Sequence, residues 1–422
     1  PGAPNNNELA QPEEKLAGLR INPAIFSRSR SNGYTGIELR SLTNEKRIQL
    51  NNLPKGKLMD VSFSPDDKQL AFIVENDDGL TLWRYDINSK KTSQVSTKKI
   101  NASLGGAKYR WKRDSSGFYT RLTVAKASER PIESSNTIEP VIQTSTGEKA
   151  AVRTYSNLLK TPHDEALFSF LTTSQLAEIS LQGKVTPLGK PGIIRQYSMS
   201  PNGEYLLVSQ YKKPFSYLVP ASRFPLLTQV WNTQGKLVKT IADLPSGESI
   251  PKGFDSVREG RRSIDWRDDK AATLYWAQAL DGGNMSNDVP FHDSVYTWQA
   301  PFNKKPVELM KMERRYSGIQ WSNDNFAIAS DWRFSDRQVR SWKFSPANPK
   351  AKTVLFEERS YNDRYNDPGN FAYERNQFGV NVIKLINEST VLLTGSGASP
   401  KGNVPFLDSF DFSTTKKQRL WQ

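Results

Sequence analysis

The chain has 422 residues, with 58 Lys and Arg against 44 Asp and Glu, so its formal net charge is 58 − 44 = +14. Hydrophobic residues make up 36%, and ten Trp, fifteen Tyr and twenty Phe supply enough apolar surface for a large core, which excludes a disordered chain. The absence of cysteine excludes disulfides and cysteine-based metal sites. No apolar run approaches the roughly 20 residues of a membrane span, so we expect a soluble globular protein without membrane insertion.

The first 35 residues form an extension ahead of the repeated part of the chain. Residues 1–7 show no initiator Met and no signal-peptide pattern, which we interpret as a processed or trimmed start. Residues 12–19 predict one or two helical turns before Pro23. We place the repeated part at 36–422.

Two kinds of β-hairpin alternate along residues 36–422. In the first kind, a bulky apolar residue and one spacer precede a polar turn and a short β-type run, as in 63–74. Copies begin at Phe63, Trp111, Met199, Trp266 and Trp321, with a looser copy in which 380–386 pairs with 391–394. Hairpins of the second kind begin at Ile37, Leu82, Leu176, Gln229, Val295, Ser341 and Phe410.

Two hairpins per unit, repeated about every 40–50 residues, are typical of a β-propeller. Six hairpins of the first kind and seven of the second predict an all-β chain that holds about six and a half blades of a seven- or eight-bladed propeller. One alternative is a missed degenerate hairpin, and another is a ring that closes over the half blade. The predicted units are a half blade at 36–52 and full blades at about 60–98, 107–190, 195–243, 262–312, 317–358 and 378–422.

An irregular insertion occupies residues 125–162, inside the second full blade. It is rich in Ser, Thr, Glu and Lys, and we expect a short helix near 155–160. Insertions of this length in compact folds are functional or mobile.

The residues that catalysis needs are scarce. Gly-x-Ser-x-Gly, the motif of the nucleophile elbow, is absent, as are phosphate-binding glycine motifs. The two histidines, His163 and His292, each adjoin an acid, but neighbouring side chains on a strand point to opposite faces, so adjacency does not indicate a charge relay. We therefore interpret both as surface or structural histidines, and predict no catalytic residue, metal site or cofactor in this chain.

The arginines are the remaining candidates for a function. Arginine suits carboxylates because its planar fork matches two oxygens, and it also binds nucleic-acid phosphates. Acids at 259, 265, 268 and 269 interleave with the cluster at 257–267, which favours a salt-bridged face or carboxylate binding over nucleic acid. The predicted carboxylate-binding residues are Arg258, Arg261 and Arg262, followed by Arg28, Arg30 and Tyr34.

Several segments together resemble one family. They are 16–21, 27–30, 34–37, 213–225, 256–267, 274–283 and, most specifically, GASPKGNVPFLD at 397–408. Together they resemble the N-terminal β-propeller of prolyl oligopeptidase-family serine peptidases, in the glutamyl endopeptidase-like branch. The resemblance covers essentially the whole chain.

The resemblance implies a partner outside this sequence. Such a propeller is followed by a C-terminal α/β-hydrolase domain with a Ser/Asp/His triad, which is absent from residues 1–422, so we expect the chain to be inactive alone. The propeller would admit short or unfolded peptides and favour cleavage after Glu. Bacterial relatives imply a periplasmic or secreted protein and plant relatives a plastid one. A stand-alone propeller that serves as a protein- or peptide-binding scaffold is the alternative.

Overall fold

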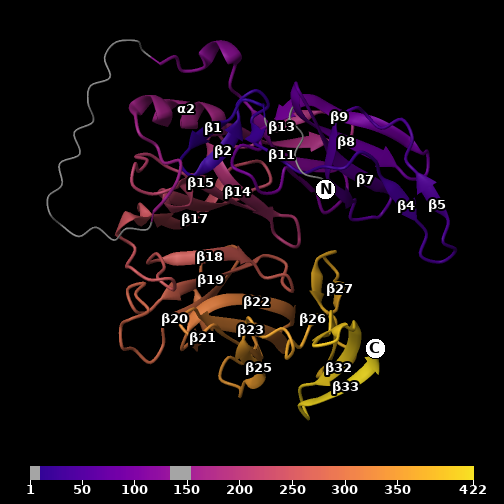
Figure 1. Ribbon diagram of the computed structural model, residues 1–422, viewed down its shortest axis with the longest axis vertical. Coiled ribbons are helices and arrows are strands. Elements are labelled where there is room, and N and C mark those ends of the chain that lie inside the picture. The colour runs from indigo at the N-terminus through magenta and orange to yellow at the C-terminus, as the bar shows by residue number, and fades with distance from the viewer. Residues whose placement is uncertain (1–9, 134–153) are drawn as a thin grey trace. The chain divides into compact units, whose positions relative to one another are not determined.

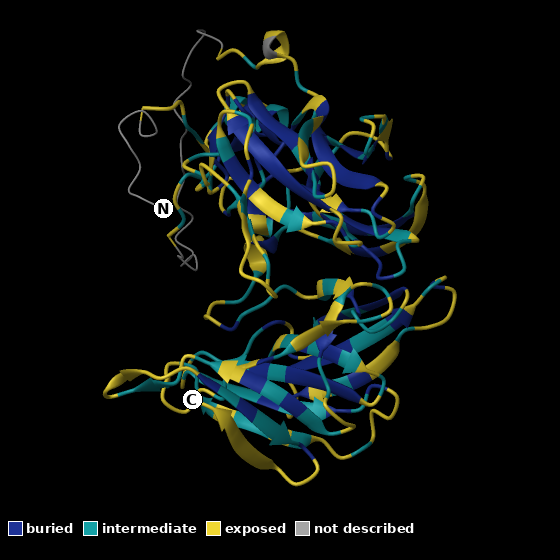
Figure 2. Cartoon of the chain, turned by 90° about the vertical axis from the view of Figure 1, so that its right-hand side faces the viewer, coloured by how far each residue is buried: buried dark blue, intermediate teal, exposed yellow. Residues whose placement is uncertain are grey.

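The polypeptide folds almost entirely into antiparallel β-sheets (Figure 1), and the computed structural model describes residues 10–133 and 154–422. Internal contacts divide the chain into two units. The first holds residues 1–198 and 206–248, and the second holds 199–205 and 249–422. Figure 2 shows that the buried residues of each unit follow its strands, whereas exposed residues follow the loops.

The N-terminal extension forms a small sheet, so the predicted helical turns at 12–19 are wrong. Strands β1 (Glu14–Leu16), β2 (Leu19–Asn22) and β3 (Ser27–Arg28) pair antiparallel in that order. Ala17 and Gly18 turn the chain with positive φ angles of 50° and 79°, which no α-helix contains. A side chain at position 18 would also collide with Pro220, since an added Cβ would lie 2.7 Å from the Pro220 Cβ.

One two-stranded hairpin precedes the first full blade. Strands β4 (Glu38–Arg40) and β5 (Arg47–Gln49) form this hairpin. The blade that follows pairs its four strands in chain order: β6 (Lys57–Phe63), β7 (Gln69–Asn76), β8 (Gly79–Asp86) and β9 (Lys91–Ile100). Strand β7 is buried from Gln69 to Glu75, because its apolar run packs on both faces of the sheet.

The second blade carries the insertion. Its strands are β10 (Tyr109–Trp111), β11 (Gly117–Thr123), β12 (Ser174–Ser180) and β13 (Val185–Pro187), and the pair Leu122–Ile100 joins it to β9. The insertion begins with the 3₁₀ turn η1 (Ala127–Glu129), and its residues 134–153 lie outside the described part of the chain.

The α-helix of the insertion begins later than predicted. Helix α2 spans Pro162–Thr172, so the expectation of a helix near 155–160 is wrong. Thr161 caps it, because its side chain accepts from the backbone N–H of Asp164 while the Asp164 carboxylate accepts from the Thr161 N–H. This capping box and the proline at the first helical position are start signals legible in the sequence. Among the described residues, no helix is long and apolar enough to cross a membrane.

The remaining sheets repeat the same four-stranded order. The third is β14 (Ile193–Met199), β15 (Tyr205–Tyr211), β16 (Leu226–Asn232) and β17 (Leu237–Leu244), with 3₁₀ turns η2 (Ala221–Arg223) and η3 (Gly247–Ser249). The fourth is β18 (Arg261–Trp266), β19 (Thr273–Ala279), β20 (Asp293–Gln299) and β21 (Val307–Met312). The fifth is β22 (Arg315–Asn323), β23 (Phe326–Arg333), β24 (Gln338–Phe344) and β25 (Val354–Ser360).

The last sheet departs from the predicted pairing of 380–386 with 391–394. Its strands are β26 (Asn370–Phe371), β29 (Thr390–Gly395), β32 (Phe406–Asp411) and β33 (Lys416–Trp421). Residues 381–383 form β28, which pairs instead with β27 (Tyr373–Arg375), and only the bridge Leu385–Val391 remains of the predicted hairpin. Strands β30 (Ala398–Ser399) and β31 (Gly402–Asn403) form a further small hairpin.

The strand order identifies the fold class. Four sheets contain four antiparallel strands each in meander order, and an eight-stranded sheet holds two further sets of four, β6–β9 and β10–β13. A four-stranded antiparallel meander is the blade of a β-propeller. The predicted all-β, propeller-type class is therefore confirmed. The number of blades in a closed ring stays a prediction.

Candidate functional site

The six predicted carboxylate-binding residues lie in both units. Arg28, Arg30 and Tyr34 belong to the first unit, and Arg258, Arg261 and Arg262 belong to the second. The two groups are therefore two separate sets of candidates.

Arg28 ends strand β3 opposite Ile21 and is half-buried. Within residues 10–133 and 154–422, no acidic side chain or other acceptor pairs with its guanidinium. Burial lowers the pKa of Arg28, because desolvation disfavours the charged form. A half-buried cation without a partner would gain stability from an anionic ligand.

Arg30 and Tyr34 follow Arg28 on a more exposed stretch. The Arg30 Nε lies 3.7 Å from Oε2 of Glu13, a loose pair. The backbone of Tyr34 exchanges two hydrogen bonds of 2.8 Å with Leu58, and its side chain is 67% exposed. This bridge fixes the backbone of Tyr34 and leaves its ring available for contacts.

Arg261 is held between two indole rings of its own blade. Its guanidinium carbon lies 4.5 Å from the ring centroid of Trp276 and 5.3 Å from that of Trp298. Both distances are within the range of cation–π attraction. Burial lowers the pKa of Arg261. Arg258 is half-buried in the loop that precedes β18.

Arg262 faces an internal carboxylate rather than the surface. Its Nη2 forms an ion pair with Oδ2 of Asp293, and its side chain is 14% exposed. Burial lowers the pKa of Arg262, and the charge of Asp293 opposes that shift. The Arg262 Nη1 is buried and has no hydrogen-bond partner among the described residues.

Arg315 is the centre of this buried network, and it is 1% exposed. Its Nη1 donates to Oδ1 of Asp293 at 2.9 Å, and its Nη2 donates to Oδ2 of Asp281 at 2.5 Å. Its Nε donates to the carbonyl of Asp255 at 2.7 Å, and Nη1 also reaches the carbonyl of His292 at 3.0 Å. The Arg315 guanidinium therefore binds two buried carboxylates, of which Asp293 also pairs with Arg262, and it ties the loop at 255 to strands β20 and β22.

His292 belongs to the same network as a structural histidine. It is 9% exposed, and its Nδ1 lies 2.7 Å from Oδ2 of Asp281, the oxygen that Arg315 also binds. Arg315 could not be singled out from the sequence, because its partners lie 22 to 60 residues away along the chain. Nothing local in the sequence indicates these pairs.

Replacing Asp281 with Asn is expected to reduce the acid sensitivity of the protein. Burial alone would raise the pKa of Asp281, but hydrogen bonds and charges from Arg315 and His292 outweigh it and hold the pKa below its ordinary value. A carboxyl with a depressed folded pKa adds stability that is present above the unfolded pKa, near 3.9, and is lost as the pH falls through the folded pKa. Unfolding free energies measured from pH 7 down to pH 2.5 should thus fall less steeply below about pH 4 in Asp281→Asn than in the native chain. Equal acid-side slopes would contradict the assignment.

A metal centre has no support in the described part of the chain. Within residues 10–133 and 154–422, no group of three His, Asp or Glu side chains is placed so that it could hold a metal ion.

Two plant proteins are similar to nearly all of this chain. "Probable glutamyl endopeptidase, chloroplastic" from Oryza sativa subsp. japonica is 35% identical over 438 aligned residues, which cover 99% of this chain and 47% of that protein. The protein of the same name from Arabidopsis thaliana is 35% identical over 436 residues, which cover 98% and 45%. The chain is a relative of these glutamyl endopeptidases. The predicted resemblance to the glutamyl endopeptidase-like branch is thereby confirmed, and the chain spans about half the length of the plant glutamyl endopeptidases it matches.

Two solved structures from peptidases can be superposed on most of this chain. Prolyl oligopeptidase B from Galerina marginata matches with 15% identity and a TM-score of 0.43, over 86% of this chain and 42% of that one. The β-propeller domain of the Trilobed protease from Pyrococcus furiosus matches with 11% identity and a TM-score of 0.43, over 92% and 90%. Because both TM-scores are below 0.5, the fold class rests on the strand order of the sheets. No family model matches the chain.

Proposed function

We propose that this chain is the propeller portion of a serine peptidase related to the glutamyl endopeptidases, and that it restricts access to the active site. The support is 35% identity along nearly the whole chain to proteins named glutamyl endopeptidase, which are about twice as long. A ring of blades around a central channel would admit short or unfolded peptides and exclude folded proteins.

The chemistry of peptide-bond hydrolysis would come from a C-terminal α/β-hydrolase domain with a Ser/Asp/His triad. The histidines of this chain are poorly suited to that role. His163 lies in the first turn of α2, and the Asp281–His292 pair is buried against Arg315. Among the described residues, no serine or threonine hydroxyl hydrogen-bonds to the His292 ring, so a nucleophile is missing beside it.

The preference for an acidic residue at the cleaved position would come from arginines of this chain. Arg28 is the main candidate. It is half-buried and has no anionic partner within the described residues, so a substrate carboxylate would offset the cost of its desolvation. Arg30 and Tyr34 would extend the same surface. Arg258 and Arg261 are the candidates of the second unit, whereas Arg262 would act through its pairing with Asp293.

Replacing Arg28 with Met in the native protein that carries this chain is expected to weaken cleavage after Glu selectively. The test compares kcat/KM for two peptides that differ only by Glu or Gln at the cleaved position. Loss of one charge-assisted hydrogen-bonding partner should lower the Glu value about 10- to 100-fold and leave the Gln value nearly unchanged.

Arg47→Met is the matched control, because Arg47 is an exposed arginine of the first unit that pairs with Glu38. It should leave both values unchanged. An unaltered Glu-to-Gln ratio in Arg28→Met would remove Arg28 from substrate recognition, and the same assay of Arg258→Met and Arg261→Met would then test the second unit. A native protein that cleaves neither peptide would contradict the proposed function itself.

The compartment that we propose depends on the kind of organism from which the chain comes. The two relatives are named chloroplastic. We propose a plastid location if the chain comes from a plant and a periplasmic or secreted one if it comes from a bacterium.

A further inference from the structure

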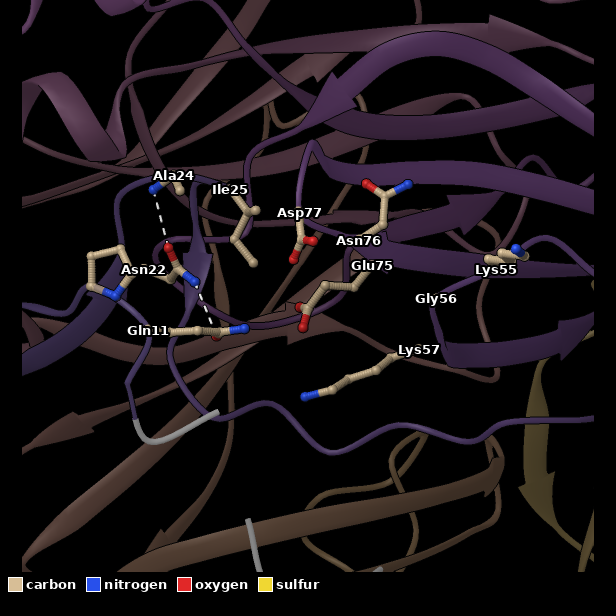
Figure 3. Close-up of a pocket in the computed structure, with 11 residues that line it drawn as sticks. Gln11, Asn22, Ala24, Ile25, Lys55, Gly56, Lys57, Glu75, Asn76 and Asp77 are labelled. Atoms are coloured by element: carbon tan, nitrogen blue, oxygen red, sulfur yellow. Dashed lines mark hydrogen bonds between the residues drawn. The ribbon is translucent and has the colours of Figure 1, made fainter. Parts of the chain in front are cut away.

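A pocket of about 450 Å³ lies in the first unit, between the N-terminal segment and the β6–β7 hairpin (Figure 3). Gln11 and Asn22 line it from the N-terminal segment, and Lys57, Glu75 and Asp77 line it from the blade. None of these residues is among the arginines discussed above. The size falls within the range of pockets that bind small molecules, roughly 300–1,000 Å³.

Charged groups of both signs point into this pocket. Figure 3 shows the carboxylates of Glu75 and Asp77, the Lys57 ammonium and the Gln11 amide turned toward a common space, whereas Lys55 points away. Lys57 and Glu75 are cross-strand partners in the β6–β7 ladder, so their side chains leave the same face of the sheet. The positive and negative groups therefore line the same wall of the pocket.

Partly buried hydrogen bonds fix the walls of the pocket. The Ser31 hydroxyl lies 2.9 and 2.8 Å from the two oxygens of Glu75, and the Lys57 Nζ donates to the Ser31 carbonyl at 3.3 Å. Glu75 is 8% exposed. These bonds hold an anion and a cation of the blade in place beside the N-terminal segment.

A second set of bonds orients the opposite wall. Asn22 is 4% exposed and accepts from the backbone N–H of Ala24 at 3.1 Å. Its Nδ2 donates to Oε1 of Gln11 at 3.2 Å, which turns the Gln11 amide N–H groups toward Glu75 (Figure 3). The pocket thus offers fixed donors at Gln11 and Lys57.

The Asp77 carboxylate supplies an acceptor for a ligand. Asp77 lies at the exposed β7–β8 turn, and within 10–133 and 154–422 no cation or hydrogen-bond donor pairs with its carboxylate. A ligand with an ammonium group could bind there, with Glu75 behind it. A carboxylate on the same ligand would then face Lys57 and the Gln11 amide.

We propose that this pocket binds a compact α-amino acid zwitterion, either a free amino acid or a dipeptide with both ends unblocked. The α-ammonium binds Asp77 and Glu75, and the α-carboxylate binds Lys57 and Gln11. Two carboxylates, one ammonium and an amide donor complement both charged ends of such a ligand. The volume leaves room for one or two side chains. This site is independent of the proposed peptidase function.

Titration calorimetry of the 422-residue chain with L-alanyl-L-alanine tests the proposal. The dipeptide should bind, and its N-acetyl and C-terminal amide forms should each bind about 10-fold more weakly or not at all, because each lacks one charged end. Asp77→Asn should weaken binding of the dipeptide by a similar factor. The fold of the Asp77→Asn variant should be unaffected, because Asp77 is exposed. The unfolding temperature of the variant without ligand checks this.

Asp78→Asn is the matched control, because Asp78 is the neighbouring exposed acid of the same turn and does not line the pocket. It should bind the dipeptide as the native chain does. The proposal is overturned if the native chain gives no binding heat at millimolar dipeptide, if the blocked forms bind equally well, or if Asp77→Asn and Asp78→Asn behave alike.

Discussion

Replacing Arg315 with Met is expected to lower the free energy of unfolding of the second unit by about 3–5 kcal/mol. The side chain is 1% exposed and contacts Asp281 and Asp293, both of which are buried. Without it, Asp281 keeps only the His292 ring and Asp293 only Arg262 as basic side-chain partners among the described residues, and a buried ion that loses a partner is costly. The carbonyls of Asp255 and His292 also lose a donor.

Urea unfolding followed by tryptophan fluorescence measures the effect of Arg315→Met. Arg364→Met is the matched control, since Arg364 is exposed and forms no ion pair within the described residues. It should change the unfolding free energy by less than about 0.5 kcal/mol. If Arg315→Met were as mild as Arg364→Met, the network would not hold the second unit together as described.

Phe168→Ala is expected to destabilise the first unit by about 3–5 kcal/mol. The ring of Phe168 is fully buried, and its centroid lies 5.1 Å from that of Phe215 and 5.6 Å from that of Phe224, edge-on to both. Truncation removes these contacts and leaves a cavity that the rigid sheets around it cannot close. Helix α2 is attached to the unit through this cluster, so the helix should be lost with the same transition.

Thermal unfolding followed by far-ultraviolet circular dichroism measures the effect of Phe168→Ala. Phe63→Ala is the matched control, because Phe63 belongs to the same unit and is 46% exposed. Its unfolding temperature should stay close to that of the native chain. Equal shifts for the two variants would mean that α2 does not depend on Phe168.

The blade strands were predictable because each hairpin is a local pattern. A turn such as 64–67 and the run after it lie within a dozen residues, so the sequence holds all the information that pairing needs. The errors occur where local signals were outweighed or overlooked. At 12–19, a helix-compatible composition is overridden by the positive φ of Ala17 and Gly18, and at 162–172 the cap at Thr161 was overlooked.

The candidate site was predictable only as a set of residue types. The arginine clusters were visible, but their partners were not, because Arg262 pairs with an acid 31 residues away and Arg315 with one 34 residues away. Such distances along the chain are closed only by the stacking of strands into sheets. For the same reason, the acids at 265–269 indicated that the charge of the arginine cluster is neutralised. They did not indicate that Arg262 pairs with Asp293.

The proposed function requires that this chain is part of a longer serine peptidase. The most direct measurement is the intact mass of the native gene product, before and after reaction with a fluorophosphonate probe that labels active-site serines. We expect a mass about twice 47.7 kDa, because the chain covers about half the length of its plant relatives, and the addition of a single probe molecule. A mass near 47.7 kDa without labelling would contradict it and would make the chain a stand-alone binding propeller.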